Sequence, residues 1–122
     1  MFSPHNPRNF LLLAAKLLKD ANYPHLETRV RTSIGRAYYA AFLLSKAKQE
    51  TRGHSFPDDH NVHNCVINSL QDDHLSNIAS KLDELKGFRS DADYHMNANL
   101  SNIDGDKCLR LAENILTLLD SV

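Results

Sequence analysis

The chain has 122 residues, the size of one domain, so we expect a single unit over residues 1–122. Hydrophobic residues make up 42% and charged residues 24%, a balance that excludes wholesale disorder. With tyrosine left aside, the longest apolar run, residues 10–15, is far shorter than the roughly 18 residues that a membrane span needs.

Two cysteines, Cys65 and Cys108, provide neither a disulfide framework nor a metal cage. The first residues also lack the basic region, apolar core and small-residue cleavage site of a secretory signal. We therefore predict a cytoplasmic protein with two free thiols and without a metal or other cofactor.

The net charge of −1 hides an asymmetry between the two halves of the chain. Residues 1–52 contain nine Lys or Arg and three Asp or Glu, a net charge of +6, whereas residues 53–122 contain five and twelve, a net charge of −7. A basic half can attract a polyanion such as RNA although the whole chain is acidic. The two halves can equally attract each other when they pack, so charge alone does not favour a nucleic-acid partner.

Helical spacing of apolar residues runs through the whole chain, and strand patterns are almost absent. Residues 7–20 are predicted to form the first helix, with Asn6 as its cap and Pro7 at its first position. A longer helix is predicted from about Pro24 to Arg52. Its apolar face consists of Val30, Ile34, Ala37, Tyr38, Ala41 and Leu44. Three further residues widen this face and suggest a partner surface such as a homodimer interface: Tyr39, Phe42 and Leu43.

Four more helical segments are predicted in the second half. Asp58 or Asp59 can cap a helix over residues 60–71, whose expected inward-facing residues are Val62, Cys65, Val66, Ser69 and Leu70. The next helix, over residues 75–86, is expected to stop near Gly87. A segment over residues 88–98 continues in the same direction or kinks. Asp104 and Asp106 open a final helix over residues 105–120, whose expected inward-facing residues are Leu109, Ala112, Ile115, Leu116 and Leu119. The expected fold is therefore an all-α, up-and-down bundle of four main helices plus one or two short helices.

Seven histidines are many for this length, and three of them, His54, His60 and His63, fall close together. His60 and His63 are spaced to share a helix face, as metal ligands do, but the chain has no HExxH pattern. A solvated loop is the simpler interpretation of this cluster, and we expect no metal site.

The segment LKGFRSDADYHMN, residues 85–97, is polar where a bundle helix should supply apolar residues. Asp91 and His95 lie four positions apart, so the carboxylate can orient the imidazole. Arg89 and Asp93 have the same spacing and can form an ion pair. One interpretation is therefore a solvated helix face with two modest ion pairs.

The other interpretation is a phosphodiester site. Arg89 could bind a phosphate through two hydrogen bonds and stabilise the charge that develops on it. His95 could take or give the proton of a ribose 2′-hydroxyl, whose attack on the neighbouring phosphate cleaves RNA without a metal. Six positions on an ideal helix rotate by about 240° and rise about 9 Å. Arg89 and His95 would therefore meet only through a kink after Gly87, through their long side chains or across a dimer axis.

Two stretches of the chain resemble the HEPN domain family, and their order and spacing extend the resemblance to most of residues 7–120. SIGRAYYAAF, residues 33–42, is similar to the second helix of one prokaryotic HEPN subgroup. LDELKGFRSDADYH, residues 82–95, is similar to the helix of that subgroup that ends in R-x-x-A-D-Y. Arg89 and His95, with five residues between them, also match the wider family's R-x(4–6)-H pattern.

The resemblance implies a HEPN bundle that is usually a homodimer, with the arginine and histidine of both protomers in one cleft at the interface. It implies that Arg89 binds phosphate and that His95 is the catalytic histidine of a metal-independent ribonuclease that cleaves single-stranded RNA or tRNA. Such a chain would be a toxin or defence protein paired with a minimal nucleotidyltransferase antitoxin, and Tyr94 is the nearest tyrosine that such a partner could modify. The alternative is a non-catalytic HEPN module that binds a nucleotide or the nucleotidyltransferase.

Arg36 lies inside an apolar helix and is expected to reach a buried carboxylate. The candidate partners are Asp91, Asp93 and Glu84. The alternative for Arg36 is a contribution to a phosphate or nucleotide site.

Overall fold

The computed structural model describes residues 6–20, 22 and 25–122 of the chain. It contains, in chain order, α1 (Arg8–Lys19), α2 (Leu26–Thr51), α3 (Val62–Asp72), α4 (Ser76–Tyr94) and α5 (Asn102–Asp120). These described ranges contain no strand, so the predicted all-α bundle is confirmed. The predicted start of the second helix, Pro24, lies outside the described residues.

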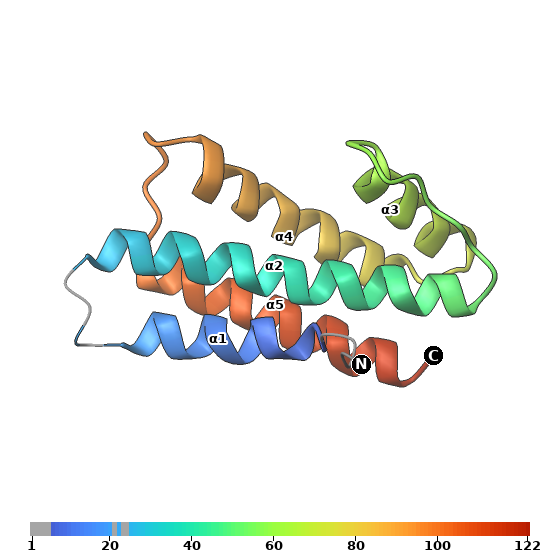
Figure 1. Cartoon of the computed structure of the whole chain (residues 1–122), viewed down its shortest axis with the longest axis horizontal. Helices are drawn as coiled ribbons and strands as arrows, with labels where there is room; N and C mark the ends of the chain where they lie inside the picture. Colours follow the sequence, from blue (N-terminus) through green and yellow to red (C-terminus); the bar gives the residue numbers. More distant parts are fainter. Residues whose placement is uncertain (1–5, 21, 23–24) are drawn as a thin grey trace, which may run out of the picture.

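The longest helix, α2, lies at the centre of the bundle and contacts each of the other four helices (Figure 1). α1 and α5 pack along one side of α2, while α4 packs on the other side and α3 lies where α2 ends and α4 begins. An ion pair of 2.8 Å between Arg8 and Asp120 joins the start of α1 to the end of α5. No helix among the described ranges is both long enough and apolar enough to cross a membrane.

The wide apolar face of α2 follows from this central position. Of the six residues predicted to face inward, five are buried and Leu44 is half-buried. Phe42 is buried as well, and Tyr39 and Leu43 are half-buried against the same core. The additional apolar residues thus contact helices of the same chain, so the width of this face gives no reason to expect a partner there.

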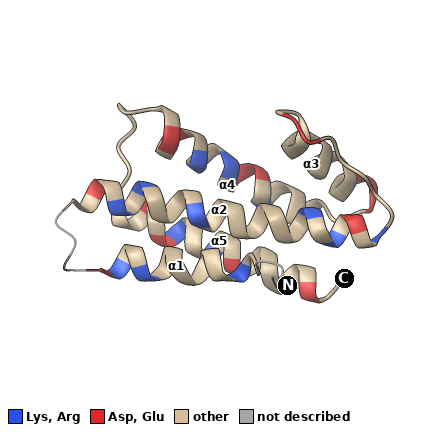
Figure 2. Cartoon of the chain, viewed as in Figure 1, with Lys and Arg blue, Asp and Glu red and all other residues tan. Residues whose placement is uncertain are grey.

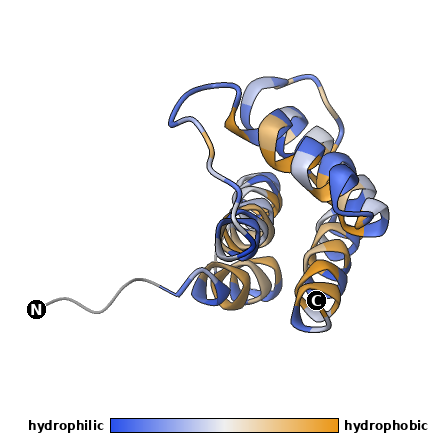
Figure 3. Cartoon of the chain, turned by 90° about the vertical axis from the view of Figure 1, so that its right-hand side faces the viewer, coloured by the Kyte–Doolittle hydropathy of each residue, from blue (hydrophilic) through white to orange (hydrophobic). Residues whose placement is uncertain are grey.

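Hydrophobic residues of the helices face a shared interior, as the view along the bundle shows (Figure 3). In α5, all five residues predicted to face inward are buried: Leu109, Ala112, Ile115, Leu116 and Leu119. In α3, Val66, Ser69 and Leu70 are buried as predicted, whereas Val62 and Cys65 are half-buried.

α4 is one continuous helix, so the predicted stop near Gly87 is wrong. Gly87 is exposed, and a methyl group on its Cα would meet no atom within 4 Å. Glycine weakens a helix without ending it when the flanking turns are packed. Leu85 before Gly87 and Ala92 after it are both buried, and their packing keeps the helix continuous as far as Tyr94.

α5 begins three residues earlier than predicted because its cap is Ser101. The Ser101 hydroxyl accepts a hydrogen bond from the backbone N–H of Asp104 (3.4 Å), and the Asp104 carboxylate accepts one from the backbone N–H of Ser101 (2.9 Å). This reciprocal arrangement is a capping box. The side chain of Asp104 therefore caps the helix from its third position. As a result, α5 begins at Asn102, only a short connection after the end of α4 at Tyr94.

Charged residues of both halves of the chain meet in the folded molecule. Figure 2 shows Lys and Arg along α1 and α2 and both signs of charge along α4. Ion pairs such as Arg52 with Asp73 (3.2 Å) join the basic and acidic halves. Part of the charge asymmetry therefore serves packing within the chain.

Candidate functional site

The end of α4 carries four of the five residues that the sequence singles out. Arg89, Asp91 and Tyr94 lie in the last two turns of the helix, and His95 is the residue directly after it. Arg36 comes from α2, which packs against α4. α2, α4 and the residue that directly follows α4 thus supply all five side chains.

The guanidinium group of Arg89 is enclosed by protein groups. Its Nε lies 2.9 Å from a carboxylate oxygen of Asp93, which confirms the predicted pairing. Its Nη2 donates hydrogen bonds to the hydroxyls of Tyr39 (3.0 Å) and Tyr94 (3.4 Å). The guanidinium carbon also lies 5.6, 5.5 and 5.2 Å from the ring centres of Tyr38, Tyr39 and Tyr94. We call these three rings, together with Asp93, the Arg89 cage.

Arg89 keeps its positive charge in this cage. Burial disfavours the charged guanidinium and would alone lower its pKa, but the hydroxyls of Tyr39 and Tyr94 and the carboxylate of Asp93 outweigh burial and raise the pKa of Arg89. The Arg89 side chain is only 17% exposed, whereas Tyr94 is 65% exposed. Tyr94 therefore forms the side of the cage that faces the solvent.

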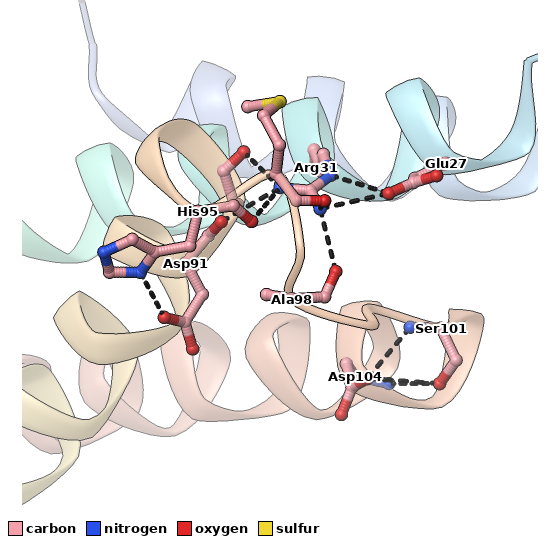
Figure 4. A network of polar contacts seen from close by, with 9 residues as sticks. Glu27, Arg31, Asp91, His95, Ala98, Ser101 and Asp104 are labelled. Atoms are coloured by element: carbon pink, nitrogen blue, oxygen red, sulfur yellow. Dashed lines mark hydrogen bonds and ion pairs between the residues drawn. The ribbon is translucent and has the colours of Figure 1, made fainter.

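His95 and Asp91 form the second pair of the site. The Nδ1 atom of His95 lies 2.8 Å from Oδ1 of Asp91, one turn earlier in the chain (Figure 4). Both side chains are accessible, with exposed fractions of 62% and 48%. The carboxylate fixes the orientation of the ring, and the other ring nitrogen, Nε2, is left to exchange a proton with a ligand.

One copy of the chain does not bring Arg89 and His95 together. No hydrogen bond or ion pair joins them in the described structure; Arg89 contacts the tyrosines of α2, and His95 is paired with Asp91. Because α4 is continuous past Gly87, a kink does not reduce the rotation of about 240° between their positions. A kink after Gly87 is therefore excluded as the way in which Arg89 and His95 could meet.

The prediction that Arg36 pairs with a buried carboxylate is wrong. All three expected partners bind other residues: Asp91 binds His95, Asp93 binds Arg89, and Glu84 lies 3.0 Å from Lys107. The guanidinium of Arg36 instead lies over the ring of Phe10, 5.6 Å from its centre, and no described carboxylate neutralises it. Arg36 also lines a hollow of about 170 Å³ between α2 and α4. The other residues that line it are Thr32, Gly35, Tyr39 and Asp93.

A family model for the HEPN domain matches residues 8–122, which include all five helices. The chain belongs to the HEPN domain family. No curated protein and no solved structure matches the chain significantly. HEPN domains are often ribonucleases or nucleotide-binding modules, and they commonly dimerise. The fold expected from the two resembling stretches is thus confirmed for this HEPN domain.

Arg31 of α2 is a further arginine that reaches the end of α4, and no sequence motif pointed to it. Its side chain is only 11% exposed. Its Nη1 and Nη2 donate hydrogen bonds to five backbone carbonyl groups, those of Asp91 (2.9 Å), Ala92 (3.0 Å), His95 (3.2 Å), Met96 (3.3 Å) and Ala98 (2.8 Å). Figure 4 shows this guanidinium between the chain after α4 and the carboxylate of Glu27.

Local sequence spacing gives only one signal for this arrangement. Glu27 lies four positions before Arg31 on α2, and its carboxylate oxygen is 3.1 Å from Nε of Arg31. The carbonyl groups that Arg31 binds are 60 to 67 residues away in the sequence. A contact over that separation depends on how α2 and α4 pack, so no local pattern predicts it.

The three clustered histidines have different surroundings in this HEPN domain. His63 is buried, and its Nδ1 lies 2.9 Å from the hydroxyl of Tyr38. Nε2 of His54 lies 2.9 Å from a carboxylate oxygen of Asp73, while His60 is exposed. In the part of the chain that the structure describes, no three His, Cys, Asp or Glu side chains are arranged to hold a metal ion.

The two cysteines are free thiols. Cys108 is buried in α5, and burial raises the pKa of its thiol to about 12. Because the thiolate is the reactive form of cysteine, Cys108 is a core residue rather than a nucleophile.

Proposed function

We propose that this HEPN domain is a metal-independent endoribonuclease that cleaves single-stranded RNA or tRNA as a homodimer. The observation that carries the proposal is the pairing of His95 with Asp91, with a distance of 2.8 Å and an imidazole that is 62% exposed. An accessible imidazole held by a carboxylate meets the geometric needs of a general base. The match to the HEPN family supports a nucleic-acid or nucleotide ligand.

In the proposed reaction, Nε2 of His95 takes the proton of a ribose 2′-hydroxyl while Nδ1 stays on Asp91. The 2′-oxygen then attacks the neighbouring phosphorus, and the bond between phosphorus and the 5′-oxygen breaks. The products are a 2′,3′-cyclic phosphate and a 5′-hydroxyl, whose proton comes from a protonated imidazole or from water. Arg89 stabilises the additional negative charge on the phosphate oxygens.

The proposal includes a dimer because Arg89 and His95 do not meet within one chain. Arg89 reaches toward α2, and His95 lies on a different side of α4. A second copy can bring the arginine of one chain to the histidine of the other. The pairing of Asp93 with Arg89 offsets the repulsion between that carboxylate and an RNA backbone, while Asp91 keeps its charge beside a neutral His95.

The hollow beside Arg36 supports a path for the RNA backbone. Arg36 carries a charge that no described carboxylate neutralises, and Asp93, the acidic residue of the hollow, is paired with Arg89. An unpaired guanidinium next to a neutralised carboxylate attracts a phosphate. We therefore assign Arg36 to a phosphate that neighbours the scissile one.

The biological role that we propose is that of a toxin in a toxin–antitoxin or defence module in the cytoplasm, neutralised by a minimal nucleotidyltransferase. Tyr94 is the residue through which such a partner would act. The residue is 65% exposed and its hydroxyl binds Arg89, so a group added to that hydroxyl would also disturb the phosphate site.

A second candidate function is a non-catalytic HEPN module that binds a nucleotide or the nucleotidyltransferase. It is favoured by the Arg89 cage, because Asp93, Tyr39 and Tyr94 already bind the guanidinium that the ribonuclease needs for phosphate. In that case the cage stabilises the contact between α2 and α4, and His95 has no chemical role.

Induced expression in a bacterial host distinguishes the two functions. For the ribonuclease we expect growth arrest and fragmented total RNA with the wild type, and neither with His95→Ala or Arg89→Gln. His60→Ala and Arg110→Ala are matched controls, because both residues are exposed and neither belongs to α2 or α4, and they should behave as the wild type. Normal growth and intact RNA for every protein at equal soluble expression would favour the binding module.

A further inference from the structure

One side chain of α2, that of Arg31, makes several hydrogen bonds to the segment that carries His95. His95 follows the last residue of α4, and residues 95–101 connect α4 to α5. Arg31 binds three carbonyl groups of this connection, those of His95, Met96 and Ala98. It also binds the carbonyl groups of Asp91 and Ala92 in the last turn of α4.

Arg31 binds here because the end of α4 presents carbonyl groups that need hydrogen-bond donors. The last carbonyl groups of a helix have no partner within it and form the negative end of the helix dipole. A guanidinium offers five N–H groups in a planar fork, so one side chain can bind several carbonyl groups at once. The Arg31 side chain is 11% exposed, and Glu27 balances its charge at 3.0 Å.

One nitrogen of Arg31 connects both members of the His95 pair. Nη1 lies 2.9 Å from the carbonyl oxygen of Asp91 and 3.2 Å from that of His95. The side chains of the same two residues meet at 2.8 Å. Without Arg31, the remaining backbone hydrogen bonds of His95 are its N–H to Asp91 (3.2 Å) and its carbonyl from Ala98 (3.0 Å).

We propose that Arg31 is a positioning residue for His95: by holding the carbonyl groups of Asp91 and His95 on one nitrogen, it sets the backbone on which the two side chains pair. This inference rests on the proposed ribonuclease function. Arg31 itself contacts backbone atoms and Glu27, so it positions the general base and does not touch the reacting groups.

Arg29 provides a matched control on the same helix. Its Nη1 donates to the carbonyl oxygen of Leu18 at 3.3 Å, so Arg29 caps the end of α1 as Arg31 caps the end of α4. Arg29→Met therefore removes an arginine from α2 and a helix-end contact without touching the segment of His95. Arg31→Lys keeps the charge of Arg31 but loses the planar fork.

The kinetic test compares Arg31→Met, Arg31→Lys and Arg29→Met in cleavage of a short single-stranded RNA. We expect Arg31→Met to lower kcat by at least about tenfold with KM within a factor of about two, because a displaced general base slows the chemical step but leaves phosphate binding intact. Arg31→Lys should fall between Arg31→Met and the wild type. Added guanidinium ion should raise the rate of Arg31→Met, and Arg29→Met should cleave as the wild type does.

A second measurement does not depend on activity. The ¹⁵N spectrum of the histidine rings reports whether Nδ1 of His95 is bound to Asp91, and amide exchange reports the order of residues 95–98. We expect Arg31→Met to change the His95 ring signals and to speed amide exchange in that segment, whereas Arg29→Met changes neither. Unchanged ring signals and unchanged exchange in Arg31→Met would overturn the positioning role, even if His95→Ala abolishes cleavage. Absence of cleavage in the wild type would instead overturn the ribonuclease, and the spectra would still decide the role of Arg31.

Discussion

The hydroxyl of Tyr38 and Nδ1 of His63 lie 2.9 Å apart in the core, where α2 meets α3. Burial raises the pKa of Tyr38 well above its ordinary value, and burial together with the charge of Lys86 lowers the pKa of His63. The phenol therefore keeps its proton and donates it to a neutral imidazole. The carboxylate of Asp83, 3.5 Å from Nε2 of His63, favours the charged ring, but burial and the charge of Lys86 outweigh it and keep the pKa of His63 lowered.

This contact predicts that acid destabilises the fold through His63. The pKa of His63 is lower in the folded chain than the ordinary value of 6.5, so between these two values the unfolded chain binds one more proton. The free energy of unfolding should therefore fall as the pH drops below about 6.5, by at most about 1.4 kcal/mol per pH unit from this residue. Urea unfolding of the wild type and of His63→Gln at pH 7.5 and pH 5.5 measures the effect, and equal losses in both proteins would contradict it.

Gly87→Ala is expected to stabilise the domain. Gly87 is exposed inside α4, and a methyl group there meets no atom within 4 Å. Replacing a helical glycine with alanine reduces the entropy of the unfolded chain and should add about 0.5–1 kcal/mol to the free energy of unfolding. Thermal melting tests this prediction, and a lower Tm would mean that the helix is interrupted at Gly87 as the sequence suggested.

The sequence predicted the parts of this molecule that depend on local spacing. The periodic apolar residues of α2 and α5 specified both helices and their buried faces. The four-residue spacings specified the ion pair of Arg89 with Asp93 and the contact of Asp91 with His95. The predicted end of a helix near Gly87 was wrong because buried residues before and after Gly87 keep α4 continuous.

Contacts between distant helices were not predictable in this way. Arg36 was expected to bind one of three carboxylates, but each of them has a nearer basic or imidazole partner, which only the packing of α4 against α2 and α5 determines. The contacts of Arg31 with the end of α4 have the same origin. The sequence therefore indicated the residues of the candidate site, but it did not indicate the long-range contacts of Arg31 and Arg36.

Asp91→Asn tests the orientation of the imidazole. The amide keeps the size of the side chain and the backbone carbonyl that Arg31 binds, but it loses the charge that holds Nδ1 of His95. We expect cleavage to fall by at least about tenfold, and by less than the roughly 10²- to 10⁴-fold loss from removing the general base in His95→Ala. Asp106→Asn removes a carboxylate from a matched pair on α5, Asp106 with Arg110, and should leave the rate unchanged. An Asp91→Asn protein as active as the wild type would remove Asp91 from the site.

Arg36→Ala tests the phosphate path along the hollow between α2 and α4. Affinity for a single-stranded oligonucleotide with 2′-deoxy sugars, which cannot be cleaved, should weaken. The slope of log affinity against log salt should lose about 0.7, the contribution of one phosphate on a single strand. Arg110→Ala, on α5, should leave both quantities unchanged. Equal slopes for Arg36→Ala and the wild type would show that Arg36 binds no phosphate.

The central claim, that Arg89 of one chain works with His95 of another, is tested most directly with a mixed dimer. Arg89→Gln and His95→Ala chains carrying different tags are co-expressed, and the heterodimer is purified through both tags and assayed on single-stranded RNA in the presence of EDTA. One of its two sites then contains an intact arginine and an intact histidine. We predict that each parent homodimer is inactive and that the heterodimer cleaves at about half the wild-type rate, leaving 2′,3′-cyclic phosphate ends. A folded heterodimer as inactive as its parents, beside an active wild type, would contradict the shared site.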